Sequence, residues 1–372
     1  MQHQTLSGAG VLHTGIEVED GFDFMSEEYR GFYNGERGTA FQAPLWMDTI
    51  HRRLVPALGA TQRTVTVRNR KDGSLVAVLP MVMQRSAGIS IMQPADFGIC
   101  DYNSVVADPL RLAQLASDAE AKDALRQTMK GADLLMFRKV RSDGFNVSLL
   151  FDGMKASAGE NAANAIEVGE DFEHWRNRVL RKKFTKELGR LQRQTERENG
   201  SYEHRLLTEE SEIARAFEFL REAQGDRPHE SLLGNPLYFD FYKDYAIAGA
   251  RSGEAQTYAS FIGGEIAAAL FGPTGDGQFH AVLIGADMRR FEKISAGIQI
   301  IYRVVEMRFQ EGFRTLDMGL GDSGYKSHFR PSVTPMRNFT LSRTPAGAVM
   351  AFVYHRSKPL KNLLKGFMPN VR

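Results

Sequence analysis

The stretch from Gln278 to Arg330 constrains the fold of this 372-residue chain more than any other part of the sequence. Phe279–Ile284 is a short apolar run rich in β-forming residues, which predicts a buried strand. After a loop, apolar side chains recur at helical spacing at Ile298, Ile301, Tyr302, Val305 and Phe309. Gly312 ends this helix, and Thr315–Met318 predicts the next strand. The order of strand, long helix and strand is typical of an α/β unit.

The start of this long helix is a candidate anion-binding site. Ser295 is a candidate N-cap, and Gly297 in the first turn lets a ligand approach the backbone closely. A helix start leaves free N–H groups at the positive end of the helix dipole, and this arrangement binds phosphate or pyrophosphate. An ordinary β-α-β unit without a ligand is the alternative interpretation.

Composition indicates a globular protein of two ordinary domains. The chain is 42% hydrophobic and 25% charged, with a net charge of +2, so no overall field selects nucleic acid or an anionic membrane. The single cysteine, Cys100, excludes an internal disulfide framework, and we expect it to be buried and structural. There is no apolar run long enough to span a membrane and no secretory signal, so we expect a cytoplasmic protein. No His/Cys cluster has metal-ligand spacing, so we expect no metal.

The order of elements in the first half of the chain recurs in the second. Thr64–Arg68 and Leu75–Met83 predict a hairpin around an Asp-Gly turn, and Gln256–Ile262 and Glu265–Phe271 predict another around Gly-Gly. Two helical patterns precede each hairpin, and a strand, a helix and a strand follow it. We therefore infer an internal duplication of one α/β unit.

Two segments are basic. Asp171–Asn199 predicts one helix in which bases outnumber acids, which indicates either a solvated face or an electropositive wall for an anionic substrate. The segment after Arg343 holds five Lys/Arg and no acids. It predicts either a surface helix that touches a membrane or a regulatory site, or a segment packed over the second domain.

Two motifs of the opening stretch, taken together, resemble the GNAT acyltransferase superfamily in its FemAB/CelD-like branch. One is Ser295-Ala296-Gly297 at the helix start, and the other is Asp317-Met318-Gly319-Leu320-Gly321 followed by Tyr325-Lys326. Asp101-Tyr102 also resembles the Asp-Tyr of that family. The branch includes proteins linked to bacterial exopolysaccharide and cellulose synthesis.

The resemblance covers residues 25–345 and implies an α/β (α+β) fold. It implies two tandem GNAT-like domains, each a mixed, mostly antiparallel twisted sheet flanked by helices. The predicted divisions are a flexible tail over 1–24, domains over 25–165 and 166–345, with the basic linking helix at 171–199 in the second, and a basic tail over 346–372.

The resemblance also implies an acyl-CoA-dependent N-acyltransferase that transfers an acetyl or another acyl group to an amine, such as an amino sugar of a bacterial surface polysaccharide. The predicted donor-binding residues are Leu283 and Ile284 along the pantetheine arm, and Lys293, Ser295, Ala296 and Gly297 at the pyrophosphate. The acceptor is predicted to be a small molecule or a glycan, with possible peripheral contact to the inner membrane through the C-terminal tail, and not DNA.

Acyl transfer from a thioester to an amine needs a neutral amine and a proton for the departing thiolate. Tyr325 is the candidate acid, with a packed aromatic as the alternative, and Lys326 is a candidate source of positive charge. Asp101 is the candidate group that binds or deprotonates the acceptor. The remaining candidates for acceptor binding are Tyr102, His280 and Asp322, of which His280 is otherwise a core residue.

Two rival functions remain open. An aminoacyl-tRNA-dependent Fem-type transferase would share the fold, but the chain lacks the long two-helix arm of the Fem proteins, so tRNA ranks below acyl-CoA. A non-catalytic, nucleotide-responsive effector of polysaccharide synthesis is the other rival, with the basic tail as its sensor.

Overall fold

The computed structural model describes residues 13–33, 37–223, 232–275 and 277–356. The strands are β1 (Thr14–Glu19), β2 (Ala60–Gln62), β3 (Thr64–Asn69), β4 (Leu75–Leu79), β5 (Met81–Ser86), β6 (Ile89–Pro94), β7 (Val106–Ala107), β8 (Leu134–Arg141), β9 (Lys155–Glu167), β10 (Tyr202–Leu207), β11 (Ala255–Ile262), β12 (Glu265–Gly275), β13 (Gln278–His280), β14 (Leu283–Ala286), β15 (Thr315–Leu320) and β16 (Ser332–Ser342). The α-helices are α1 (Glu27–Phe32), α2 (Pro44–Thr49), α3 (Val55–Ala57), α4 (Pro109–Ser117), α5 (Ala119–Thr128), α6 (Phe172–His174), α7 (Lys182–Asn199), α8 (Glu210–Ala223), α9 (Pro236–Ser252), α10 (Met288–Phe291), α11 (Ala296–Gln310) and α12 (Pro345–Arg356).

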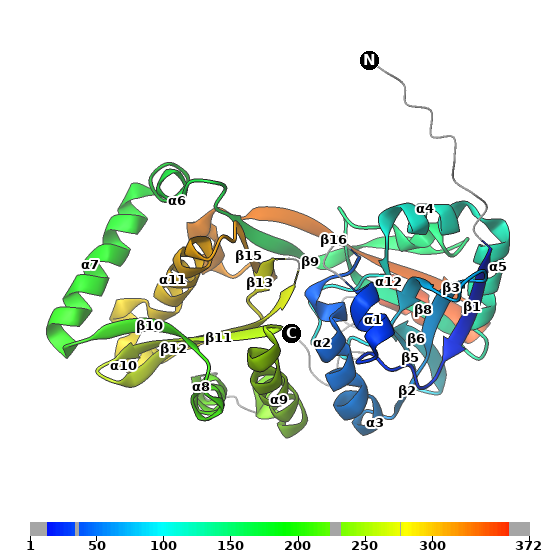
Figure 1. Ribbon diagram of the computed structural model, residues 1–372, viewed down its shortest axis with the longest axis horizontal. Coiled ribbons are helices and arrows are strands. Elements are labelled where there is room, and N and C mark those ends of the chain that lie inside the picture. Colours follow the sequence, from blue (N-terminus) through cyan, green and yellow to red (C-terminus); the bar gives the residue numbers. More distant parts are fainter. Residues whose placement is uncertain (1–12, 34–36, 224–231, 276, 357–372) are drawn as a thin grey trace, which may run out of the picture.

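Two halves lie side by side, the first running from β1 to β9 and the second from α6 to β16 (Figure 1). One sheet has the strand order β1-β3-β4-β7, and the other runs β10-β11-β12-β13-β15-β9-β16-β8-β6-β5-β2, with β14 also paired to β12. Most pairs are antiparallel, and the parallel pairs are β6 with β8 and β13 with β15. This architecture confirms the mixed, mostly antiparallel α/β fold expected from the sequence.

The strand pairing of one half repeats in the other. The antiparallel pair β3–β4 corresponds to β11–β12, and β4–β7 corresponds to β12–β14. The parallel pair β6–β8 corresponds to β13–β15. A shared order of elements with a shared pairing scheme is what an internal duplication produces.

The last strand of each half is exchanged. β9 of the first half pairs with β15, and β16 of the second half pairs with β8. β9 and β16 also pair with each other and run across the middle of the molecule (Figure 1). The expected domain boundary at residue 165 therefore falls inside β9, a strand of the first half that pairs with β15 and β16 of the second, and the halves are joined through backbone hydrogen bonds.

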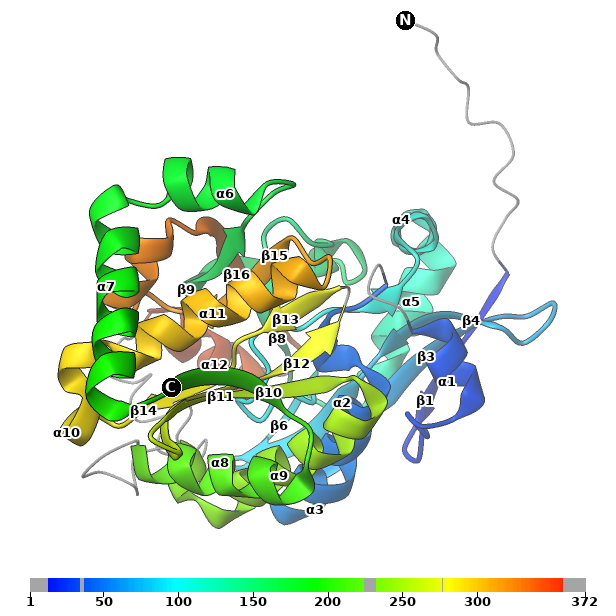
Figure 2. The same ribbon diagram turned by 60° about the vertical axis from the view of Figure 1, so that its left-hand side comes forward.

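Helices cover both faces of the second-half sheet and also connect the halves. α8 and α9 lie on one face of β10–β12 and α11 lies on the other (Figure 2). Trp46 of α2 packs edge-on against Tyr245 and Phe241 of α9, with ring centroids 4.7 and 5.3 Å apart. One hydrophobic core thus spans both halves and fixes their relative position.

Several sequence expectations are corrected. Thr14–Glu19 form β1 and pair with β3, although this stretch was predicted to lie in a flexible tail; Ile16 and Val18 alternate toward the core of the first half. The helix predicted over 110–130 is divided into α4 and α5, because Asp118 caps a new helix start. The basic linking helix is divided after the π-helical turn Trp175–Val179, because the backbones of Leu180 and Arg181 are extended and α7 starts only at Lys182.

The predicted basic tail, 346–372, contains most of α12. This helix packs on β16, the last strand of the second half, and on its partner β8 of the first half. Residues 357–372 lie outside the described residues, and contact of this tail with a membrane stays a prediction.

The strand predicted over Phe279–Ile284 is broken in two. β13 ends at His280, and β14 begins at Leu283. A Cβ at Gly272 of β12 would lie 1.7 Å from the carbonyl oxygen of His280, so only glycine admits the chain as it turns away here. Periodicity did not signal this break because the apolar run continues through it.

Candidate active site

A cavity of about 400 Å³ lies between the two halves. Strands β5, β6 and β8 line it from the first half, and β14, β15 and the 3₁₀ helix Gly324–Phe329 line it from the second. The exchanged strands β9 and β16 and the helix α12 also contribute. We call it the central cavity; its volume lies in the range of small-molecule sites.

The second half opens toward this cavity because β14 diverges from β15. β13 pairs with β15 as far as His280 and Asp317, after which β14 pairs only with β12. The other edge of β14 carries no strand in the described structure. Ile284 and Val282 line the central cavity, whereas Leu283 is buried. An open strand edge is a place where an extended ligand can pair with the backbone.

The helix α11 begins beside the far end of β14. Ser295 precedes it in the left-handed conformation (φ 55°, ψ 43°), and its side chain makes no capping hydrogen bond. Its carbonyl accepts the N–H groups of Ile298 and Gln299, so no cap competes for those of Ala296 and Gly297. A Cβ at Gly297 would lie 3.5 Å from the Cβ of Ala286, the last residue of β14.

Lys293 is an exposed base two residues before this helix start, whereas the neighbouring Arg290 pairs with Asp287 at 2.5 Å. The structure therefore brings five of the six predicted donor-binding residues to one strand edge and the adjoining helix start. Leu283 belongs to the same strand, but its side chain points into the core.

Asp101 reaches the central cavity from the first half. Its Oδ2 lies 2.7 Å from the point that a Cβ of Gly319 would occupy, and Gly319 has a φ of +72°, so glycine is required there for two reasons. Burial raises the pKa of Asp101 to about 6, and the charge of Asp317 adds to this effect, although Lys139 opposes it. A carboxylate with this pKa is a suitable base near neutral pH.

Asp317 is the buried carboxylate beneath the cavity floor, with 1% of its surface exposed. The hydroxyl of Tyr102 donates to its two oxygens at 2.8 and 2.7 Å, and the N–H of Gly319 donates at 2.6 Å. Arg141 Nη1 and His280 Nδ1 each lie 3.7 Å away. Burial acts to raise the pKa of Asp317, but His280, the Tyr102 hydroxyl and the N–H of Gly319 outweigh it and hold the pKa below its usual value.

Tyr102 and His280 therefore contact Asp317 and do not line the cavity. In this arrangement the two side chains do not reach an acceptor in the cavity directly, as was predicted, but act on it through Asp317. Asp322 is exposed and also lies outside the cavity lining. The sequence singled out Asp317 only as part of a motif. Its spacing of two residues from Gly319 was the signal that could have identified it as a site residue.

Lys326 is 4% exposed and holds the glycine-rich turn after β15. Its Nζ donates to the carbonyl oxygens of Gly319, Leu320 and Gly321 at 3.1, 2.9 and 3.0 Å. All three of its N–H bonds are thus directed at the backbone. In this arrangement Lys326 shapes the cavity wall next to Asp101.

Tyr325 lines the central cavity beside Lys326. Burial raises the pKa of Tyr325 above its ordinary value. Among the described residues no hydrogen bond engages its hydroxyl, so this group is available to a ligand.

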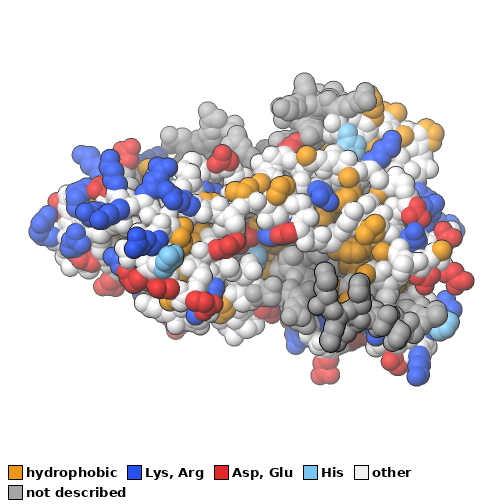
Figure 3. Space-filling model, turned by 90° about the horizontal axis from the view of Figure 1, so that it is seen from above, with side chains coloured by type: hydrophobic (Ala, Val, Ile, Leu, Met, Phe, Trp, Pro, Cys, Tyr) orange, Lys and Arg blue, Asp and Glu red, His pale blue; other side chains and the backbone are white. Residues whose placement is uncertain are grey.

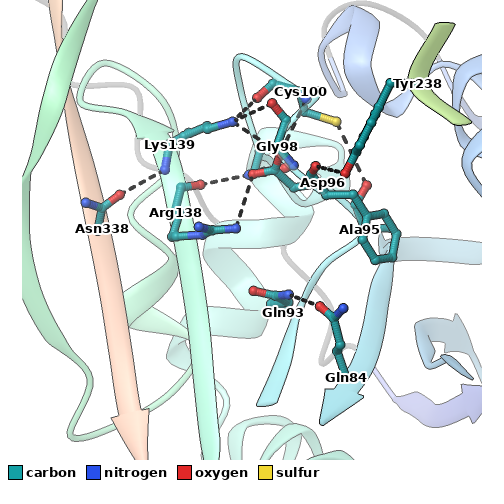
Figure 4. Close-up of polar contacts among 12 residues, drawn as sticks. Gln84, Gln93, Ala95, Asp96, Gly98, Cys100, Arg138, Lys139, Tyr238 and Asn338 are labelled. Atoms are coloured by element: carbon teal, nitrogen blue, oxygen red, sulfur yellow. Dashed lines mark hydrogen bonds and ion pairs between the residues drawn. The ribbon is translucent and has the colours of Figure 1, made fainter. Parts of the chain in front are cut away.

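A buried ionic cluster fixes the loop that carries Asp101 (Figure 4). Lys139 Nζ donates to Asp96 Oδ1 at 3.2 Å and to the carbonyl of Cys100 at 2.6 Å. Asp96 also accepts the N–H of Gly98 at 2.8 Å, and Arg138 lies 3.9 Å away. None of the residues singled out in the sequence belongs to this ionic pair, although an Asp followed by Gly98 two residues later indicates such a turn.

Cys100 in this loop is fully buried and accepts a hydrogen bond from Trp46 Nε1 at 3.3 Å. Burial raises the pKa of the Cys100 thiol well above its ordinary value. The structural role expected for Cys100 is confirmed.

Among the described residues, no group of three or more His, Cys, Asp or Glu side chains is arranged to hold a metal ion. Within the same residues, no helix combines the length and apolar character needed to span a bilayer.

Comparison with known proteins places this arrangement in a class. Residues 182–327 match the family model described as an acetyltransferase (GNAT) domain. This match includes the helix start at Ser295–Gly297 together with Tyr325 and Lys326, but not Asp101. No curated protein matches the sequence.

Solved structures share the fold over most of the chain. FemX matches with a TM-score of 0.64 at 11% identity, over 89% of this chain and 98% of its own. A conserved protein of unknown function from Bacteroides thetaiotaomicron matches with a TM-score of 0.58 at 11% identity, over 88% and 100%. L-PGS from Bacillus licheniformis matches with a TM-score of 0.53 at 14% identity, over 84% and 90%. At these identities the likeness shows the fold alone.

Residues 182–327 thus match a GNAT acetyltransferase domain, and the strand pairing of this half recurs in the first half. The match of these residues to the family model indicates an acyltransferase. The expected fold class is confirmed.

Proposed function

We propose that the protein transfers an acyl group from acyl-CoA to the nitrogen of an amine. One observation carries the proposal: the open edge of β14 connects the uncapped start of α11 to the cavity that holds Asp101. An extended thioester needs a diphosphate site at one end and a reaction site at the other.

The residues of the second half fit such a donor. The N–H groups of Ala296 and Gly297 bind the diphosphate at the positive end of the helix dipole, and Lys293 adds a charge-assisted contact. The backbone of β14 pairs with the pantetheine arm, which directs the thioester past Ile284 into the central cavity.

The chemical step uses one residue from each half. Asp101 accepts a proton from the acceptor amine, and the nitrogen then forms a bond to the thioester carbonyl carbon. The carbon–sulfur bond breaks, and the hydroxyl of Tyr325 supplies a proton to the departing thiolate. The proton on Asp101 then returns to solvent, and Tyr325 regains its own, so the net products are an amide and free CoA.

Asp317 and Lys326 position the reacting groups in this scheme. Asp317 raises the pKa of Asp101 through its charge, and Lys326 fixes the turn that Asp101 touches at Gly319. The resemblance to the CelD-like proteins supports an acetyl donor and an amino sugar of a bacterial surface polysaccharide as the acceptor.

Calorimetry with acetyl-CoA tests the donor site. Gly297→Trp fills the second position of α11 and should weaken binding by about a hundredfold, because the charge-assisted contacts of the amides are lost. Leu110→Trp is the matched control, since Leu110 occupies the second position of α4 and is 75% exposed. If the folded wild-type protein fails to bind acetyl-CoA, the donor assignment is wrong.

A second candidate donor is an aminoacyl-tRNA, and the basic face of α7 favours it. Exposed bases gather on the end of the molecule that carries α7 (Figure 3): Arg181, Lys182, Lys183, Lys186, Arg190, Arg193 and Arg197. Binding of tRNA that weakens steeply with salt, in a protein that ignores acetyl-CoA, would favour this function.

A further inference from the structure

Gln93 presents an unsatisfied acceptor to the first-half side of the central cavity. The residue lies on β6 and is only 5% exposed. Its Nε2 donates to Gln84 Oε1 at 3.2 Å, but no described residue donates to its Oε1. Figure 4 shows this oxygen on the side of the amide that faces away from Gln84. A buried acceptor without a partner is unfavourable unless a ligand or water satisfies it.

The orientation of this amide is set by its neighbours. Gln84 Nε2 donates to the carbonyl of Leu58 at 3.3 Å, so Gln84 must present its oxygen to Gln93. Gln93 must then present its own nitrogen to Gln84, which leaves its oxygen on the other side of the amide of a residue that lines the cavity. The ligand group at this point is therefore a hydrogen-bond donor.

Part of the wall around Gln93 is apolar. Ile91, Leu134 and Met136 are each no more than 3% exposed and form a cluster with Met350 of α12 on the cavity side. Met336 of β16 extends this surface toward Gly319 and Asp101. A group that lies against these side chains must present hydrocarbon to them.

The cations that line the cavity are already bound to protein atoms. Lys139 contacts Asp96 and the carbonyl of Cys100, and Lys326 contacts three carbonyl oxygens. Arg138 lies 3.9 Å from Asp96. A phosphate on the acceptor would have to displace one of these contacts and would face Asp101 and Glu160, which also line the cavity.

We propose that the first-half side of the central cavity is the acceptor pocket. It takes an unphosphorylated amine with an apolar face and a hydroxyl that donates to Gln93 Oε1, while the amine nitrogen points to Asp101. A neutral amino sugar meets this description through the C–H face of its ring, whereas a sugar phosphate or a nucleotide sugar does not. This inference rests on the proposed acylation of an amine.

Binding of matched model amines tests the pocket without turnover. Calorimetry of the full chain with CoA present compares linear amino alcohols with alkylamines of equal carbon number. At the chain length that spans Asp101 and Gln93, the amino alcohol should bind about tenfold more tightly, because only it satisfies the buried oxygen. Glucosamine should likewise bind more tightly than glucosamine 6-phosphate.

Gln93→Met keeps the volume of the side chain but removes the acceptor, so the preference for the hydroxyl should disappear. Gln93→Glu retains an acceptor and should keep the preference, which guards against a variant that fails to fold. Gln192→Met is the matched control: Gln192 is 9% exposed and donates to Tyr202 on α7's side of the second half, away from the cavity lining.

The pocket assignment is overturned if no chain length favours the alcohol, if the preference survives Gln93→Met, or if the sugar phosphate binds more tightly than the sugar. Release of free thiol from acetyl-CoA, measured on the same amines, separates the two proposals. Hydroxyl-dependent binding without thiol release supports the pocket and contradicts the transferase function. Thiol release without hydroxyl-dependent binding supports the transferase function and contradicts the pocket.

Discussion

The two halves share their strand pairing but differ where the corresponding helix begins. In the first half, the carboxylate of Asp108 accepts the N–H groups of Leu110 and Arg111 at the start of α4, and Pro109 has no N–H to offer. In the second half, Ser295 leaves the first amides of α11 uncapped. The same element is thus closed to anions in one copy and open in the other.

The loop before the short strand β7 in the first half is longer than the corresponding loop before β14 in the second. Only Ala281 and Val282 separate β13 from β14, whereas the loop from Ala95 to Val105 joins β6 to β7 and carries Asp101 to Gly319. The comparison indicates a division of labour after duplication. Under the proposed function, the second copy holds the donor site, and the first supplies the base and the acceptor wall.

Asp101→Asn should have the largest effect on this division. Removing the base should lower kcat/KM by about 10²–10⁴-fold, while the affinity for acetyl-CoA, measured by calorimetry, should stay unchanged because the donor site lies in the other half. An equal loss of kcat/KM and of acetyl-CoA affinity would show that the loop carrying Asp101 supports the donor site as well as the proton transfer.

The pH dependence of the wild-type enzyme checks the same residue. Asp101 acts as a base only when ionised, so kcat/KM should rise with pH through its raised pKa of about 6 and level off above it. The folded state holds this proton more tightly than the unfolded state, so Asp101 lowers stability as the pH rises from about 4 to above 6. Asp101→Asn should therefore unfold at a higher temperature than wild type near pH 7.

Ser295→Asp would give the second half the cap of the first. The new carboxylate should occupy the free amides of α11 and repel the diphosphate, which lowers acetyl-CoA affinity by about a hundredfold in calorimetry. Thermal unfolding should occur at a higher temperature, since a capping carboxylate stabilises a helix start. Loss of affinity together with loss of stability would instead indicate misfolding, and Ser295→Ala is the matched control that should keep both properties near wild type.

Tyr325→Phe should reduce kcat by about tenfold, because a thiolate leaves readily and depends less on an acid than an alkoxide does. The KM for the acceptor amine should change little in steady-state kinetics. An unchanged kcat would assign Tyr325 to packing, which is the alternative that its sequence context leaves open.

The sequence predicted the second half better than the contacts between the halves. Ser295-Ala296-Gly297 and the long helix are local signals, since the cap position and the helical spacing lie within one segment. The break between β13 and β14 depends on Gly272, which lies in another strand, so the run Phe279–Ile284 alone did not reveal it.

The cavity residues of the first half were harder to predict because they meet only in three dimensions. In the sequence, Gln84 and Gln93 are ordinary polar residues of two adjacent strands. Only the register of these strands shows that their amides lie together. Lys139 reads as a surface base, yet its backbone is left-handed (φ 54°) and its side chain is directed at Asp96. No local pattern encodes the exchange of β9 and β16.

Asp108→Ala has the smallest expected effect. It tests whether removing the cap of α4 lets the first half bind acetyl-CoA. The change removes the cap of α4 and should lower the free energy of unfolding by about 1 kcal/mol, measured by urea denaturation. It should not create a second donor site, because Pro109 still offers no N–H and β7 is only two residues long, too short to pair with an extended arm. Calorimetry of Asp108→Ala should therefore still give one acetyl-CoA per chain, as for wild type. A second binding event would mean that the cap alone separates the two copies, and that neither the proline nor the short strand contributes.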